Sequence, residues 1–294
     1  MKHWAWLVFA LGLPTVALAA PPQLQESMVV PGTISVNPDG TFKGYTLHEP
    51  DKLPPPVRAV IAQTLPMWTF EPIRIDGKPT TTVTTTGMQL HVVATVTHGD
   101  SALLQIVGAS FGCEAWKGAS GTPAACPPDR NVSYSERRPP PYPVAAARNG
   151  VSGEVLLMLQ IGRDGKVVQA IVHQVNLYTQ TSDAAYYRNM LAKASLRTAR
   201  KWIFRAPTEG PDALKGAWTV TVPINFILPA TRSFACTAQR RYGSWCAYLP
   251  GPVTPAPWVA DQHGGDAGAI AGDGLFVGDP RLVLETPLGP HHAS

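Results

Sequence analysis

The stretch GEVLLMLQIGRDGKVVQAIVH, residues 153–173, predicts a β-hairpin and decides the fold of the second half of the chain. Its apolar residues recur at every second position, the period of a strand with one buried face: Val155, Leu157, Leu159 and Ile161. Asp164-Gly165 follows this run, and Asp-Gly between two such runs is a strong hairpin-turn signal. The stretch therefore predicts two antiparallel strands joined at Asp164-Gly165.

Further elements surround this hairpin on both sides. Before it, residues 144–148 predict a single short helical turn. After it, residues 183–201 carry apolar side chains at steps of three and four, which predicts a helix with one buried face. Residues 218–228 alternate again and predict a third strand. The order helix, strand, strand, helix, strand indicates a small α+β unit with a three-stranded antiparallel sheet.

Six short motifs in this region occur in the order and at the spacing of a known family. They are Tyr142-Pro143, Gly150, Gly153, Asp164-Gly165, Trp202-x-Phe204-x-x-Pro207 and Val-Pro-Ile-Asn-Phe at 222–226. With these motifs, residues 139–229 resemble the TonB C-terminal domain family, almost a third of the chain. The resemblance implies a receptor-binding domain of the Gram-negative envelope.

The resemblance also implies how such a domain binds. In that family, the domain captures a short peptide, the TonB box of an outer-membrane transporter, as an added strand next to its last strand. Carried over by position, the implied peptide-binding residues are Tyr142, Pro143, Trp218, Val220, Val222, Ile224 and Phe226. The alternative is an envelope structural or adaptor module without energy transduction, which holds another envelope protein or peptidoglycan at its sheet edges.

The first half of the chain repeats parts of this pattern. Gly32 to Gly40 ends in Asp-Gly as residues 153–165 do, and Trp68-x-Phe70 matches the later Trp-x-Phe. We therefore expect residues 21–112 to be a degenerate second copy, with an unrelated β-rich module as the alternative. The expected fold class is α+β, with tandem small domains that each pack a three-stranded antiparallel sheet on one or two helices.

The beginning of the sequence predicts export. Residues 4–18 are mostly apolar, and Ala17-Leu18-Ala19 offers the small-x-small pattern of signal-peptidase cleavage. We expect a cleaved signal peptide over residues 1–20 and a periplasmic protein. The alternative is an inner-membrane anchor through residues 4–20, although a spanning helix needs about 20 apolar residues. An energy transducer of the TonB family keeps such an anchor, so the two alternatives differ in whether the chain can transmit force.

The four cysteines and the remaining segments complete the predicted organisation. In an exported chain the cysteines indicate disulfides, and the short loops favour Cys113–Cys126 and Cys236–Cys246 over the other pairings. Residues 113–138 are expected to form a disulfide loop and linker, and residues 230–249 a Cys-bridged extension. Residues 250–294 are rich in Gly, Pro, Ala, Asp and His without periodicity, and are expected to be disordered.

The sequence offers little catalytic chemistry. It contains no nucleophile elbow, His-Glu-x-x-His motif or phosphate-binding loop, and neither cysteine pair has the spacing of a zinc site. The net charge of +4 lacks the dense basic footprint of a nucleic-acid binder. We therefore expect no enzyme activity, no cofactor, no metal and no nucleic-acid partner. The oligomeric state is left open.

Overall fold

The computed structural model describes residues 25–75, 77–96, 102–112, 129, 131–228, 244–259 and 281–288. The expected signal peptide lies outside these ranges, as do Cys113, Cys126 and Cys236. No helix in the described ranges combines the length and apolar character needed to cross a membrane. The described chain is mixed α+β with antiparallel sheets, which agrees with the expected fold class.

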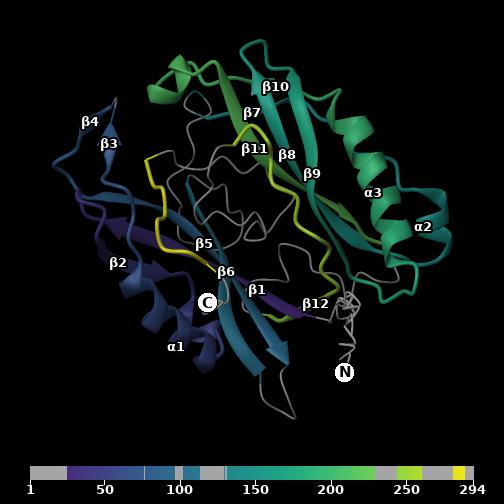
Figure 1. The fold of residues 1–294 in the computed structure, drawn as a ribbon, viewed down its shortest axis with the longest axis horizontal. Coiled ribbons are helices and arrows are strands. Elements are labelled where there is room, and N and C mark those ends of the chain that lie inside the picture. Colours follow the sequence, from purple (N-terminus) through teal and green to yellow (C-terminus); the bar gives the residue numbers. More distant parts are fainter. Residues whose placement is uncertain are drawn as a thin grey trace, which may run out of the picture.

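The C-terminal unit contains the predicted hairpin and lies with α3 at the right of Figure 1. Its main elements are α2 (Val144–Arg148), β8 (Gly153–Gly162), β9 (Val167–Leu177), α3 (Ala184–Ala199) and β11 (Ala217–Phe226), with the short 3-10 helix η3 (Pro211–Leu214) before β11. The three strands form an antiparallel sheet in the order β11-β8-β9. β8 is therefore the central strand, and β9 and β11 are the two edges.

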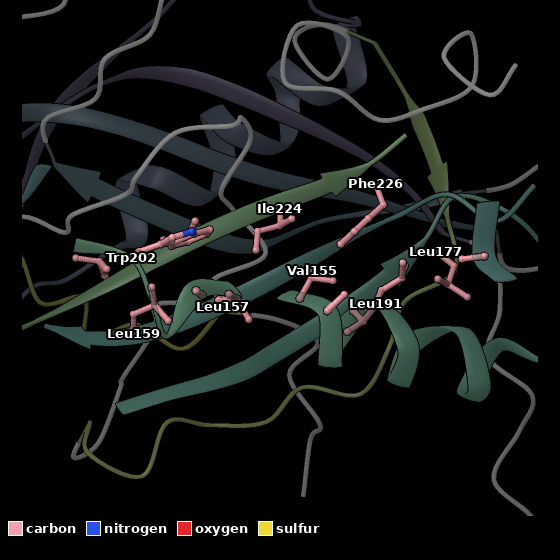
Figure 2. Close-up of a cluster of buried hydrophobic side chains, with 14 of the residues drawn as sticks. Val155, Leu157, Leu159, Leu177, Leu191, Trp202, Ile224 and Phe226 are labelled. Atoms are coloured by element: carbon pink, nitrogen blue, oxygen red, sulfur yellow. The ribbon is translucent and has the colours of Figure 1, made fainter. Parts of the chain in front are cut away.

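One face of this sheet packs against α3 and forms the core of the unit (Figure 2). Val155, Leu157 and Leu159 of β8 have no exposed surface, and neither has Leu191 of α3. Every second residue of a strand points to the same face, so the alternation in the sequence becomes this buried face. Each such side chain contributes about 1.5–3 kcal/mol by burial. The core thus fixes β8 rigidly and positions β11 beside it.

The turn between β8 and β9 is held by the short strand that follows α3, β10 (Ile203–Arg205). Phe204 N donates to Gly165 O at 2.8 Å. Gly165 has a φ of 76°, a backbone conformation that residues other than glycine adopt only at a cost in free energy. A Cβ at this position would also lie 2.0 Å from Phe204 O. Glycine is required here by both the backbone conformation and the close approach.

The N-terminal unit also combines a sheet with one main helix. Its elements are β1 (Gln25–Val36), β2 (Phe42–Leu47), η1 (Pro50–Lys52), α1 (Pro55–Thr64), η2 (Leu65–Met67), β3 (Arg74–Ile75), β4 (Lys78–Pro79), β5 (Thr84–Val96) and β6 (Ala102–Gly112). The main sheet has five strands, with β12-β1-β5-β6 in order and β2 also paired to β1. The prediction of three strands is therefore wrong for this unit, because β6 and the distant β12 extend the sheet.

The turn between β1 and β2 makes the contact seen in the C-terminal unit. Gly40 has a φ of 87°, and Phe70 N donates to Gly40 O at 2.9 Å. A Cβ on Gly40 would lie 1.9 Å from Phe70 O. Phe70 packs edge-on against Phe111 of β6, with ring centroids 5.3 Å apart. The aromatic residues after α1 thus join the turn to the core of the sheet.

Several segments that the sequence assigned to connectors pair with these units. β7 (Ser133–Glu136), in the expected linker, pairs with β10. β12 (Cys246–Tyr248), in the expected extension, pairs with the start of β1. Residues 250–259 and 281–288 differ from the expected disordered tail, since Leu284 is buried and bridges to Phe70. Short pieces held by backbone pairing with a distant strand carry no periodicity of their own, which is why the sequence did not indicate them.

Candidate functional site

The two edges of the C-terminal sheet differ in what pairs with them. Along β9, Leu249 and Leu177 exchange two backbone hydrogen bonds, with nitrogen–oxygen distances of 3.0 Å and 2.7 Å. Further along the strand, Thr254 N donates to His173 O at 2.7 Å. The outer edge of β9 is therefore paired with a later segment of the same chain.

β11 forms the other edge. It pairs with β8 along its full length, from Ala217 opposite Gly162 to Phe226 opposite Gly153. In the described part of the chain, β11 pairs with no other strand. Pro223 lies in its middle, and a proline, which has no N–H, is confined within sheets to edge positions where no ladder bond is needed. Topology and sequence agree that β11 is an edge strand.

The register shows which backbone groups of β11 face outward. Both backbone groups of Leu177 bond to Leu249, so Leu177 and Gly153 form a non-hydrogen-bonded pair. Gly153 then directs its N–H and C=O toward Phe226 on the other side. The direction of the backbone groups alternates along an antiparallel strand. The N–H and C=O groups of the even-numbered residues of β11 therefore bond to β8, and those of the odd-numbered residues point to the side of β11 away from β8. The outward set is Ala217, Thr219, Thr221, Pro223 and Asn225.

The residues of this strand that the sequence predicted as peptide-binding are the even-numbered ones, whose backbone groups bond to β8. Trp218, Val220, Val222, Ile224 and Phe226 are at most 5% exposed and lie in the core, where Figure 2 shows Ile224 and Phe226. Their side chains fill the core, and their backbone groups face β8. The outward set was not predicted. Its signal in the sequence was the polar alternation around Pro223, which by itself reads as an ordinary edge strand.

Two members of the outward set carry side-chain hydrogen bonds. Trp258 Nε1 donates to Thr219 Oγ1 at 3.2 Å. Tyr178 Oη donates to Asn225 Oδ1 at 3.3 Å. Both bonds use side-chain atoms of the outward residues, and the strand stays extended through them.

Tyr142 and Pro143 lie near the C-terminal end of β11. The ring of Tyr142 packs edge-on against Phe226, with centroids 5.4 Å apart. Its hydroxyl donates to Val151 O at 2.7 Å, and partial burial raises the pKa of that hydroxyl above its ordinary value. Pro143 is half-buried and immediately precedes α2. The structure thus places Tyr142 as a support for the end of the strand.

The described residues offer little else in the way of a site. Within these ranges, no group of three or more His, Cys, Asp and Glu side chains is arranged to hold a metal ion. Cys246 is disulfide-bonded, and because the other three cysteines lie outside the described ranges, the pairing stays a prediction.

Comparisons with known proteins concern the same unit. Residues 138–228 match the family described as Gram-negative bacterial TonB protein C-terminal. Two proteins named Protein TonB, from Xanthomonas campestris pv. campestris strain B100 and a second strain of that pathovar, are each 36% identical over 99 residues. The alignment covers 33% of this chain and 39% of each relative, so the chain spans about two fifths of their length. No solved structure matches the chain.

Proposed function

Because residues 138–228 form a TonB C-terminal domain, we propose that this chain captures an extended peptide by adding it as a strand to the outer edge of β11. The peptide is the TonB box of an outer-membrane transporter, the kind of partner with which the TonB family interacts. The chain then acts in the periplasm, in energy-dependent transport across the outer membrane, and binds rather than catalyses.

One observation carries the proposal, which is the direction of the backbone groups of β11. An edge strand presents a row of N–H and C=O groups that pair with an added strand. The register directs those of Thr219 and Thr221 away from β8. The binding residues we propose are therefore the odd-numbered ones, whereas the even-numbered residues of the sequence prediction hold the strand on the core. Tyr142 supports the end of this edge through Phe226.

The other edge of the sheet supports the same choice. β9 is already paired with Leu249 and Thr254. A peptide that adds to β9 must first displace this segment, whereas addition to β11 displaces no strand of the described chain. We therefore propose one peptide strand for each C-terminal unit.

We further propose that the N-terminal unit is a diverged copy of the C-terminal one. In both units a glycine of positive φ ends a hairpin and bonds to the phenylalanine of a Trp-x-Phe motif, Gly40 to Phe70 and Gly165 to Phe204. In both, the strand before that turn is central and pairs with the hairpin partner and a later strand. By this correspondence, β5 takes the place of β11.

The same correspondence confines peptide binding to the C-terminal unit. β5 pairs on its outer side with β6, from Gly87 opposite Gly112 to Val96 opposite Ala102. β6 therefore takes up the edge that corresponds to the proposed binding edge of β11. We expect no peptide to add to β5.

A proline placed at an outward position tests the proposal. Thr221→Pro removes one outward N–H and, since Pro223 is accommodated at the same parity, leaves the bonds to β8 in place. Thr221→Val keeps the N–H and is the matched control. One net hydrogen bond of about 0.5–1.5 kcal/mol corresponds to a loss of about 2- to 13-fold in affinity.

The affinities are measured by isothermal titration of the full chain with synthetic TonB-box peptides from Xanthomonas campestris transporters. We expect Thr221→Pro to bind more weakly than Thr221→Val, and Thr221→Val to bind like the wild type. Equal affinity of both variants would contradict the proposed edge. Failure of the wild type to bind any of the peptides would contradict the proposed function itself.

A further inference from the structure

Residues 249–254, Leu-Pro-Gly-Pro-Val-Thr, form a strap that continues directly from β12. β12 pairs with the start of β1, and Leu249 then exchanges hydrogen bonds with Leu177 of β9. Thr254 closes the strap by donating its N–H to His173 O at 2.7 Å. One continuous segment therefore pairs with the sheets of both units and covers the outer edge of β9.

The strap is held by side chains where it cannot supply backbone bonds. Pro250 has no N–H, so it cannot donate to the carbonyl groups of β9. Arg188 of α3 takes this role and donates through Nε to Val175 O at 3.2 Å. Its terminal nitrogen also donates to Leu249 O at 3.2 Å and to Pro250 O at 2.9 Å. One guanidinium thus bonds to β9 and to the strap together.

The next residue of the strap, Gly251, is recognised more closely still. Gln174 Nε2 donates to Gly251 O at 3.0 Å, and Gly251 N donates to Asn176 Oδ1 at 3.3 Å. A Cβ on Gly251 would lie 2.2 Å from Val175 O, so any larger residue must move the strap away from β9. The groups on β9 and α3 therefore accept the sequence Leu-Pro-Gly and reject a side chain at its third position.

We propose that the outer edge of β9 is a second strand-accepting site, specific for a Leu-Pro-Gly segment, and that the chain's own strap is its resident ligand. The strap closes this edge to other strands, and a peptide of the same sequence binds there in trans once the strap is displaced. The idea that the closed edge directs transporter peptides to β11 rests on the proposed function. The pairing of the strap with β9 does not depend on it.

The test displaces the strap and supplies its sequence as a separate peptide. Gly251→Val puts a side chain against Val175 O, and Gly216→Val is the matched control, because no atom lies within 4 Å of a Cβ there. The probe is a fluorescent synthetic peptide of residues 247–256. Two quantities are measured on the full chain, the anisotropy of the peptide and the hydrogen exchange of the Leu177 amide, which donates to Leu249 O.

In the wild type and in Gly216→Val, we expect a protected Leu177 amide and no peptide binding. In Gly251→Val, Leu177 exchange rises roughly tenfold or more, while amides of β8 keep their protection, and the added peptide binds and restores Leu177 protection. If Gly251→Val does not fold, Thr254→Pro serves instead, since it removes the N–H that the strap donates to His173 O and leaves the groups of β9 and α3 that would receive the peptide unchanged.

Two outcomes would overturn the inference. One is unchanged protection of Leu177 in the displaced variant, and the other is loss of protection without binding of the strap peptide. Neither depends on a TonB-box peptide. The titration of β11 therefore succeeds or fails separately from this test.

Discussion

The contact between the hairpin turn and the segment after α3 gives a sharp prediction for Gly165→Ala. Gly150, with a φ of 66°, and Gly165, with a φ of 76°, are two of the three positive-φ glycines of the C-terminal unit, and both therefore resist alanine by about 1 kcal/mol. They differ in their surroundings. A Cβ on Gly150 meets no atom within 4 Å, whereas one on Gly165 lies 2.0 Å from Phe204 O.

The clash adds to the conformational cost. To relieve it, β10 must move away from the turn, which weakens the 2.8 Å bond from Phe204 N to Gly165 O by about 1 kcal/mol. Phe204 is only 3% exposed, so its displacement costs about 1 kcal/mol more in lost packing. We therefore expect Gly165→Ala to lower the free energy of unfolding by about 3 kcal/mol, against about 1 kcal/mol for Gly150→Ala.

The assay is urea unfolding of the full chain, followed by the fluorescence of buried tryptophans such as Trp202. At about 1–3 kcal/mol per molar urea, the difference between the variants shifts the midpoint by about 1 M. Equal midpoints for Gly165→Ala and Gly150→Ala would refute the argument from close approach.

The N-terminal unit offers the same comparison in Gly40 and Gly77. Both have positive φ, but only Gly40 would place a Cβ against a carbonyl oxygen, at 1.9 Å from Phe70 O. We expect Gly40→Ala to lower the free energy of unfolding by about 2 kcal/mol more than Gly77→Ala does, as in the other unit. Equal cost of the two variants would count against the proposed correspondence between the units.

Three further predictions concern single side chains. Burial raises the pKa of Tyr134 to about 12, above its ordinary 10, so its contribution to stability is complete below pH 10 and is lost as the pH rises toward 12. Tyr134→Phe removes this contribution and makes the fall in stability shallower in urea titrations across that range, and an unchanged fall would contradict it. Leu157→Ala, at a residue with no exposed surface, lowers the free energy of unfolding by about 2–5 kcal/mol, and a loss below 1 kcal/mol would contradict its central place. Tyr142→Phe removes the 2.7 Å bond to Val151 O and lowers the thermal midpoint by the equivalent of about 1 kcal/mol, with no change expected if that bond does not form.

The sequence predicted the C-terminal unit well because its signals are local. The period of two around Val155 and the turn at Asp164-Gly165 act within one hairpin, and the helix of residues 184–199 follows its own apolar face. What the sequence did not indicate depends on partners far along the chain. β12 pairs with β1 across more than 200 residues, and its three residues carry no periodicity. Three of the six strap residues are Pro or Gly, a composition that resembles disorder until the partners on β9 are known.

The candidate site could be predicted from the sequence only in part, for a different reason. The resemblance to the TonB family pointed to Tyr142 and the last strand together, and in the structure Tyr142 packs against Phe226 of β11, while peptide binding there stays a proposal. It could not assign the parity of the strand, because apolar side chains mark the core face, whereas peptide addition uses the backbone groups of the alternate residues. Only the register to β8 and the two backbone hydrogen bonds between Leu177 and Leu249 distinguish the odd-numbered residues of β11 from the even-numbered ones.

The measurement that tests the central claim most directly is residue-resolved hydrogen exchange along β11, with and without a TonB-box peptide. We expect the peptide to slow exchange at the amides of Ala217, Thr219 and Thr221, which point away from the sheet. The amides of Val220 and Val222 already bond to β8 and should not change. Protection gained equally at odd and even residues, or gained on β9 instead, would contradict strand addition at the edge of β11.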